Sequence, residues 1–169
     1  MSANSQPVKS ESDAARQMLR HTIATVAYRG GKALRGAPAN FSQFRIGEGS
    51  RTPGQILAHI CDLFDWALSI ARGKEEWHSI EPRTWDEDVA RFSAGLTALD
   101  AYLASDAPLG APVETLFQAP VADSLTHIGQ ISMLRRLAAS PVRAENYSRA
   151  EIVAGRVGAE QTGPKREFE

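Results

Sequence analysis

The sequence predicts an all-α fold, most simply a four-helix bundle. Long segments carry apolar residues three and four positions apart, the spacing of one helical face. Two of these segments open with clear capping signals, at Thr52-Pro53 and at Thr84. No segment shows a convincing strand pattern. Helices that each carry an apolar stripe bury it by packing together, so four of them form a bundle.

The first helix is expected over residues 12–35. Gly30-Gly31 should weaken its last turns, because glycine is a poor helix former. Its apolar stripe consists of Leu19, Ile23, Val26 and Leu34. Residues 36–52 are rich in glycine and proline and predict a loop. Phe41 and Phe44 are candidates to pin that loop to the body.

The second helix is expected from Pro53 to Arg72, with Thr52 as N-cap and Gly73 ending it. It is apolar on two faces. One face carries Ile56, His59, Leu63, Trp66 and Ile70, and the other carries Leu57, Cys61, Phe64 and Leu68. A helix of this kind is buried on two sides. Either it is central to the fold, or its back face meets a second subunit in a homodimer.

Residues 73–83 form a linker, and the capping box from Thr84 to Glu87 opens a third helix that reaches Ser105. Pro120 is expected to begin the fourth helix, which ends near Ser140.

After the fourth helix, Ser148 is expected to cap a short fifth helix near residues 149–154, and the tail beyond it reads as loop. One domain is therefore expected over residues 12–155, between polar termini at 1–11 and 156–169.

Composition argues against several classes of function. The formal net charge is −1, so there is no electrostatic footprint for nucleic acid. Cys61 is the single cysteine, which favours a reducing compartment. The N-terminus lacks the apolar core of a secretory signal, and no apolar run reaches the ~18 residues of a membrane span. These features predict a soluble cytoplasmic protein without nucleic-acid or membrane partners.

Three polar residues share one face of the fourth helix: Asp123, His127 and Gln130. Leu134 and Leu137 continue that face and look like core residues. His59 lies on the inward stripe of the second helix. Two imidazoles and a carboxylate are a common ligand set for zinc, nickel or ferrous iron. Gln130 could hydrogen-bond a ligand or a metal-bound water.

Plainer interpretations stand beside this one. A His–Asp pair can be an ordinary hydrogen-bonded pair, and D-x-x-x-H on a helix is a weak signal. Asp62 and Asp65 read as solvated charges, although Asp62 could orient His59. For Trp66, a role in the hydrophobic core is favoured over a contact with substrate.

The remaining reactive residues are weaker candidates. Cys61 points away from His59 and reads as a small buried hydrophobe. His21 and His78 read as surface histidines, and His78 reaches a site only if its linker folds over the bundle.

The tracts TPGQILAHICDLFDWAL and ADSLTHIGQISMLRRLAASPV carry a family resemblance. The chain resembles the DinB-like helical bundles over roughly residues 12–150. The motifs that carry the resemblance are the lone His59 of the second helix and the H-x-G-Q-I tract from His127 to Ile131.

This resemblance implies an up-down-down-up bundle, with a crossover at 73–83, and often a homodimer. It also implies three metal-binding histidines, one on the second helix and an H-x-x-x-H pair on the fourth. His59 and His127 match that pattern, but Asp123 stands where a histidine is expected. Aspartate can still ligate a divalent ion, or it can mark a member that has lost its metal.

The function that the resemblance implies is a metal-dependent enzyme acting on a small molecule, by thiol S-transfer or hydrolysis. A low-molecular-weight thiol would be the cosubstrate. Asp62 or Gln130 would orient ligands, and Asn146 and Tyr147 could close over the pocket. The alternative is a non-catalytic dimeric bundle that binds a small ligand, with Asp123 and His127 as a buried polar pair. DNA binding is disfavoured by the charge.

Overall fold

The computed structural model describes residues 11–168, in which the regular secondary structure is helical. The four long helices are α1 (Glu11–Leu34), α2 (Pro53–Ala71), α3 (Trp85–Ala104) and α5 (Ala122–Leu137). Shorter helical pieces are η1 (Phe41–Gln43), α4 (Val113–Leu116), η2 (Phe117–Val121) and η3 (Tyr147–Arg149). Within residues 11–168 no strand forms, and one isolated bridge joins Glu145 to Glu167. The predicted all-α class is confirmed.

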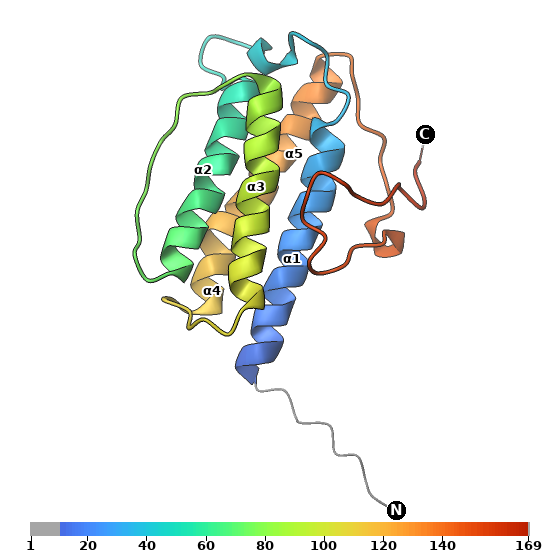
Figure 1. Cartoon of the computed structure of the whole chain (residues 1–169). Coiled ribbons are helices and arrows are strands. Elements are labelled where there is room, and N and C mark those ends of the chain that lie inside the picture. The colour runs from blue at the N-terminus through green and yellow to red at the C-terminus, as the bar shows by residue number, and fades with distance from the viewer. Residues whose placement is uncertain (1–10, 169) are drawn as a thin grey trace, which may run out of the picture.

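The four long helices lie side by side (Figure 1). Helices α1 and α2 each pack against both α3 and α5. Residues 72–84 run back along the outside of the molecule, so that α2 and α3 point the same way while α1 and α5 point the opposite way. None of the helices in the described part of the chain is long and apolar enough to cross a bilayer.

Helix α2 begins as its sequence predicts, with Thr52 as N-cap, Pro53 at the first position and a capping box that Gln55 completes. Both of its apolar faces are covered within one chain. The side chains of Ile56, Ile60 and Leu63 are at most 3% exposed, and those of Leu57, Cys61 and Phe64 at most 1%. The two apolar faces are therefore explained by a central position, and they no longer argue for a second subunit.

The start of the fourth long helix differs from the prediction. The chain becomes helical at Val113, and Pro120 lies inside a π-helical segment rather than at a helix start. A proline inside an α-helix removes one hydrogen bond and clashes with the preceding turn, and a wider π turn can accommodate it. The predicted short helix after α5 is also wrong: it is a 3₁₀ turn at 147–149, capped by Asn146, whose side chain accepts from Ser148 N.

The C-terminal segment packs on α1, and this packing continues past residue 155 (Figure 1). Val157 belongs to the hydrophobic core, with 4% of its surface exposed. Lys32 of α1 binds the carboxylates of Glu145 and Glu167, each at 2.7 Å. The predicted polar segment 1–11 lies, up to residue 10, outside the described residues, as does residue 169.

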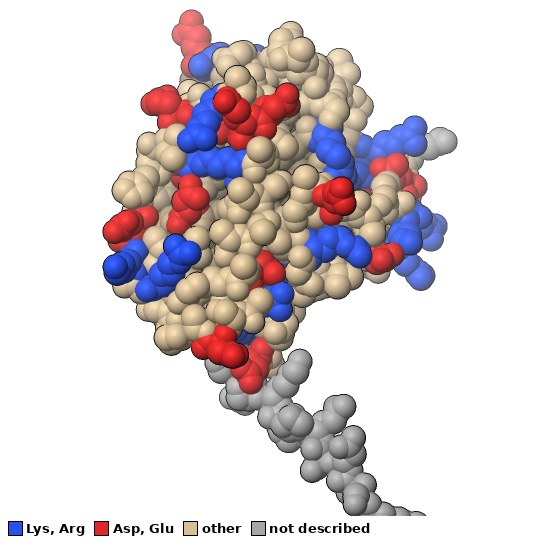
Figure 2. Space-filling view, viewed as in Figure 1, with Lys and Arg blue, Asp and Glu red and all other residues tan. Residues whose placement is uncertain are grey.

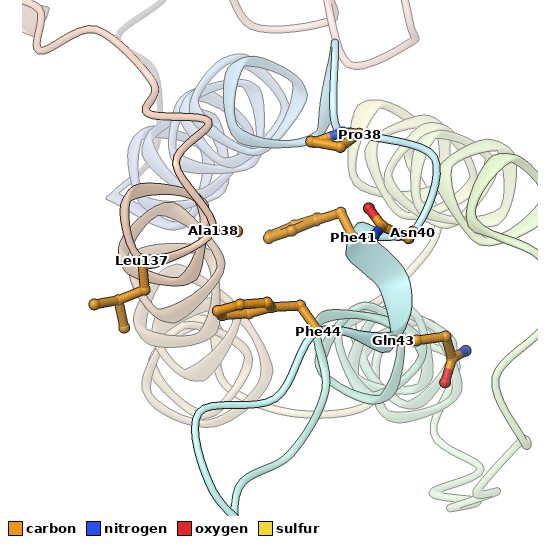
Figure 3. A pocket seen from close by; sticks show the side chains of 7 residues that line it. All are labelled: Pro38, Asn40, Phe41, Gln43, Phe44, Leu137 and Ala138. Carbon is orange, nitrogen blue, oxygen red and sulfur yellow. The ribbon is translucent and has the colours of Figure 1, made fainter.

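The loop after α1 is pinned as expected. Phe41 is 1% exposed, and Phe44 packs against the same core. Both rings point toward the end of α5 (Figure 3). The buried guanidinium of Arg135 lies over the Phe41 ring and donates to the carbonyls of Ala33, Arg35 and Gly36. Arg135 thereby satisfies a carbonyl in the last turn of α1 and two carbonyls just after the helix, which lack partners within it.

Gly30 does not end α1, which continues to Leu34. A Cβ atom at Gly30 would lie 2.5 Å from Phe92 Cζ and 3.1 Å from Ile128 Cδ1. The glycine therefore lets α3 and α5 approach α1 closely. Gly129, on the exposed side of α5, has no atom within 4 Å of such a Cβ.

These two glycines give a matched test of the packing. We expect Gly30→Ala to lower the free energy of unfolding by about 1–3 kcal/mol, because the new methyl group overpacks the core. Gly129→Ala should raise it by about 0.5–1 kcal/mol through better helix propensity. Urea denaturation followed by circular dichroism measures both values. Equal effects of the two substitutions would contradict this packing of α1.

Candidate metal centre

Helices α2 and α5 bring together His59, Asp123 and His127, the three residues singled out from the sequence. Asp123 Oδ2 lies 3.6 Å from His59 Nε2 and 3.5 Å from His127 Nε2. One ligand atom from each residue lies within 4.8 Å of the other two. Since Asp123 and His127 are one turn apart on α5, only the packing of α2 decides whether the third ligand is present.

The three polar residues of α5 do not occupy its most buried line. That line is formed by Ser124, Ile128 and Ile131, each one position after a polar residue. One position corresponds to about 100° around the helix, so Asp123, His127 and Gln130 lie on its flank. The face is thus half open to solvent, and ligands can reach it.

Side-chain exposure follows this position. It is 45% for Asp123, 25% for His59 and 12% for His127. Of the two leucines expected to continue the face into the core, Leu134 is buried but Leu137 is 54% exposed. The prediction for Leu137 was wrong because Leu137 is the last residue of α5 and its side chain points away from Phe41 and Phe44 (Figure 3).

Gln130 holds the imidazole of His127 in one tautomer. His127 Nδ1 lies 2.9 Å from Gln130 Oε1, an oxygen that can only accept a hydrogen bond. Nδ1 therefore carries the proton. Nε2, on the side of Asp123, keeps its lone pair and can bind a metal ion. Histidines that bind metals are commonly oriented in this way, through their second ring nitrogen.

Burial favours the neutral form of His59. The pKa of His59 is lowered below its ordinary value, mainly by desolvation and further by the nearby charges of His127 and Arg51. Asp123 opposes this shift. A neutral imidazole is the form that binds a metal ion, so His59 is suited to act as a ligand near neutral pH.

Trp77 is a member of the site that the sequence did not reveal. Its ring lies edge-on to that of His59, with the ring centroids 5.7 Å apart. The His127 ring also meets the His59 ring edge-on, with centroids 4.8 Å apart. Trp77 comes from residues 72–84, which are held against α2 by a hydrogen bond from Glu76 N to Ser69 Oγ. The one sequence feature that could have indicated this role is the presence of a large aromatic residue, Trp77, in an otherwise polar linker.

Two neighbours of Trp77 were candidates from the sequence. Trp66 packs against Trp77, with centroids 5.6 Å apart, and donates to Glu75 Oε1. Trp66 thus supports Trp77. The tryptophan that contacts His59 is Trp77, not Trp66. His78 is 71% exposed and lies near Glu76, so the linker brings Trp77 to the site and not His78.

Asp62 does not serve His59. Its side chain is buried, contrary to the solvated position expected for it. One oxygen lies 2.6 Å from Arg91 Nη2, and the other accepts a hydrogen bond from Ile80 N at 3.3 Å. Asp62 therefore joins α2 to α3 and holds the connection 72–84. Asp65, 49% exposed, shares the same arginine.

Tyr147 contacts α1, and Asn146 contacts its own turn and the C-terminal segment. Tyr147 packs edge-on against Tyr28, and the guanidinium of Arg29 lies 4.5 Å above its ring. Asn146 caps η3 and donates its backbone N–H to Arg166 O. The contacts of both residues are thus with α1 and the C-terminal segment, and no hydrogen bond, ion pair or ring contact joins either of them to His59, Asp123 or His127 among the described residues.

The three ligands have suitable chemistry for a borderline divalent ion. Tetrahedral ligands at about 2.0–2.1 Å from zinc lie about 3.3 Å from one another. The two distances from Asp123 are close to that value, and small rotamer changes can shorten the distance between the two imidazoles. Three protein ligands leave at least one position for water or substrate.

Removing the acceptor that orients His127 should change its tautomer. In the wild-type protein we expect the neutral imidazole of His127 to carry its proton on Nδ1. Gln130→Leu, which keeps similar bulk, should abolish that preference. Long-range ¹H–¹⁵N correlation spectra of the histidine rings distinguish the two forms. His21, exposed on α1, is the internal control and should not change.

No family model, curated protein or solved structure matches this chain. On the face shown in Figure 2, positive and negative side chains are interspersed without a basic patch. The function must therefore be inferred from the residues around His59, Asp123 and His127.

Proposed function

We propose that this protein is a DinB-like bundle that binds a divalent metal ion through His59, Asp123 and His127 and acts on a small molecule. The observation that carries the proposal is the convergence of these three ligands from two helices. The helix directions agree with those that the family resemblance implies, since α2 and α3 run parallel and are joined by a long connection (Figure 1).

The surrounding residues prepare each ligand. Gln130 fixes the tautomer of His127, and burial keeps His59 neutral. Asp123 supplies a negative charge from the open side of the site. Trp77 shields one edge of His59 from water. Such preparation lowers the cost of assembling the site around an ion.

The proposed reaction class is thiol S-transfer, with hydrolysis as the second choice. A bound divalent ion would lower the pKa of a coordinated thiol or water and so supply a nucleophile near neutral pH. Among residues 11–168, the single cysteine does not supply a competing nucleophile at the site. Cys61 is buried, its Sγ lies 3.4 Å from the carbonyl of Asp88, and burial raises its pKa well above the usual range.

The alternative, a buried Asp123–His127 pair without metal, is less well supported. Asp123 is 45% exposed and lies almost equally far from two imidazoles, at 3.5 and 3.6 Å. An ordinary hydrogen-bonded pair would be shorter and would need only one histidine. A carboxylate placed between two imidazoles is typical of a ligand set.

Metal analysis of the full chain, purified without a histidine tag, tests the site. We expect about one Co²⁺ or Zn²⁺ per chain, with the absorption bands of four- or five-coordinate Co²⁺. His59→Ala and His127→Ala should each weaken binding by more than about 100-fold. His21→Ala, a change on the exposed side of α1, is the control and should bind as the wild type does. Absence of stoichiometric metal at every loading condition would contradict the proposal.

Two substitutions at Asp123 test whether this residue coordinates the metal ion. Asp123→His restores the expected third histidine and should retain Zn²⁺. Asp123→Asn removes the charge and should weaken binding by about 10–100-fold. If both variants bind as the wild type does, Asp123 is not a ligand.

The reaction class can be tested with a generic substrate pair. We expect the Zn²⁺-loaded protein to accelerate the conjugation of a small thiol with an aryl chloride, and the metal-free protein and His127→Ala not to do so. Absorbance of the thioether product measures the rate. Hydrolysis of an activated ester by the same three samples covers the second reaction class. Equal rates with and without metal in both assays would rule out a metal-dependent enzyme of either type.

A further inference from the structure

A polar pocket adjoins His59 and has no lining residue from α5. It has a volume of about 330 Å³ and lies between the start of α2 and the last part of the connection 72–84. Its lining consists of Arg51, Gln55, Ala58, His59, Asp62 and residues 79–82. His59 is thus shared by the pocket and the metal centre, and a molecule in the pocket lies beside the metal ligands.

Two side chains offer hydrogen-bond donors to this pocket. Arg51 is exposed and forms no hydrogen bond or ion pair with any residue between 11 and 168. Gln55 uses its side-chain oxygen to accept from Thr52 N at 2.9 Å, and this contact fixes the amide. The amide nitrogen of Gln55 has no partner among the described residues and remains a donor.

The acidic residues of the pocket do not neutralise Arg51. Asp62 is compensated from the other side by Arg91 and by the N–H of Ile80. Glu81 is exposed and forms no ion pair with Arg51 in the described part of the chain. The positive charge of Arg51 is therefore available to a ligand, and a metal ion at His59 would add to the positive potential.

We propose that Arg51 and Gln55 bind the carboxylate of a small anionic substrate whose reacting end reaches the metal centre at His59. This inference rests on the proposed function, since it names the substrate class of the same site. A guanidinium donates two parallel hydrogen bonds to a carboxylate, and an amide N–H can supply a third. One arginine and one amide suit a planar monoanion better than a phosphate dianion, which usually recruits several cations.

Thiols with and without a carboxylate test the pocket in the Co²⁺-loaded protein. The probes are 3-mercaptopropionate and 4-mercaptobutyrate, each compared with its amide, and the near-ultraviolet thiolate-to-Co²⁺ band reports binding. We expect at least one acid to bind about five- to tenfold more tightly than its amide. Arg51→Gln should abolish this preference, and Arg136→Gln, on the exposed end of α5, should keep it. Work at pH 8 keeps His59 neutral in every variant.

A second measurement tests the pocket without metal. Benzoate and benzamide are titrated into the ¹⁵N-labelled metal-free protein, and shifts of the Arg51 and Gln55 amide signals are recorded. Benzoate should shift them at lower concentration than benzamide, and Arg51→Gln should remove the difference. Stoichiometric metal without any carboxylate preference in either assay would overturn this inference alone. Failure to bind metal, with the benzoate preference intact, would overturn the proposed function and leave a carboxylate pocket.

Discussion

The burial of α2 on both of its apolar faces is the constraint on which the rest of the structure depends. Leu57 and Phe64 on one face and Ile56 and Ile60 on the other are almost fully excluded from water. Burying side chains of this size is worth roughly 1.5–3 kcal/mol each, so no arrangement that exposes either face can compete. Helices α3 and α5 must therefore both pack on α2, and α1 completes the bundle across them.

The candidate site follows from the strip of α2 that this packing leaves uncovered. His59 lies where α2 meets the flank of α5, so it reaches Asp123 and His127 without entering the dry core. The connection 72–84 covers the same strip. Asp62 and Ser69 hold its backbone, and Trp77 comes to rest on His59. The candidate metal centre and the pocket beside Arg51 are thus two parts of one edge of α2.

Local signals predicted much of the fold. The N-cap and proline at Thr52-Pro53 and the capping box at Thr84 placed the starts of α2 and α3 correctly, because a cap depends only on residues within one turn. The same logic failed at Pro120, where helical structure on both sides carries the chain through as a π turn. Leu137 and Asp62 were misjudged because helical periodicity shows which residues share a face, but not where along the helix a neighbour begins or ends.

The sequence by itself determined the helical class, the Asp123–His127 pair, and Gln130 as a neighbour of His127, since each depends on spacing within a helix. Only the tertiary structure decided that His59 meets this pair, that Trp77 rather than His78 covers it, and that Asp62 binds Arg91 instead. These contacts join residues that are far apart in the sequence: 18 positions separate His59 from Trp77, and 68 separate His59 from His127. They depend on how the helices pack, and no local pattern encodes that packing.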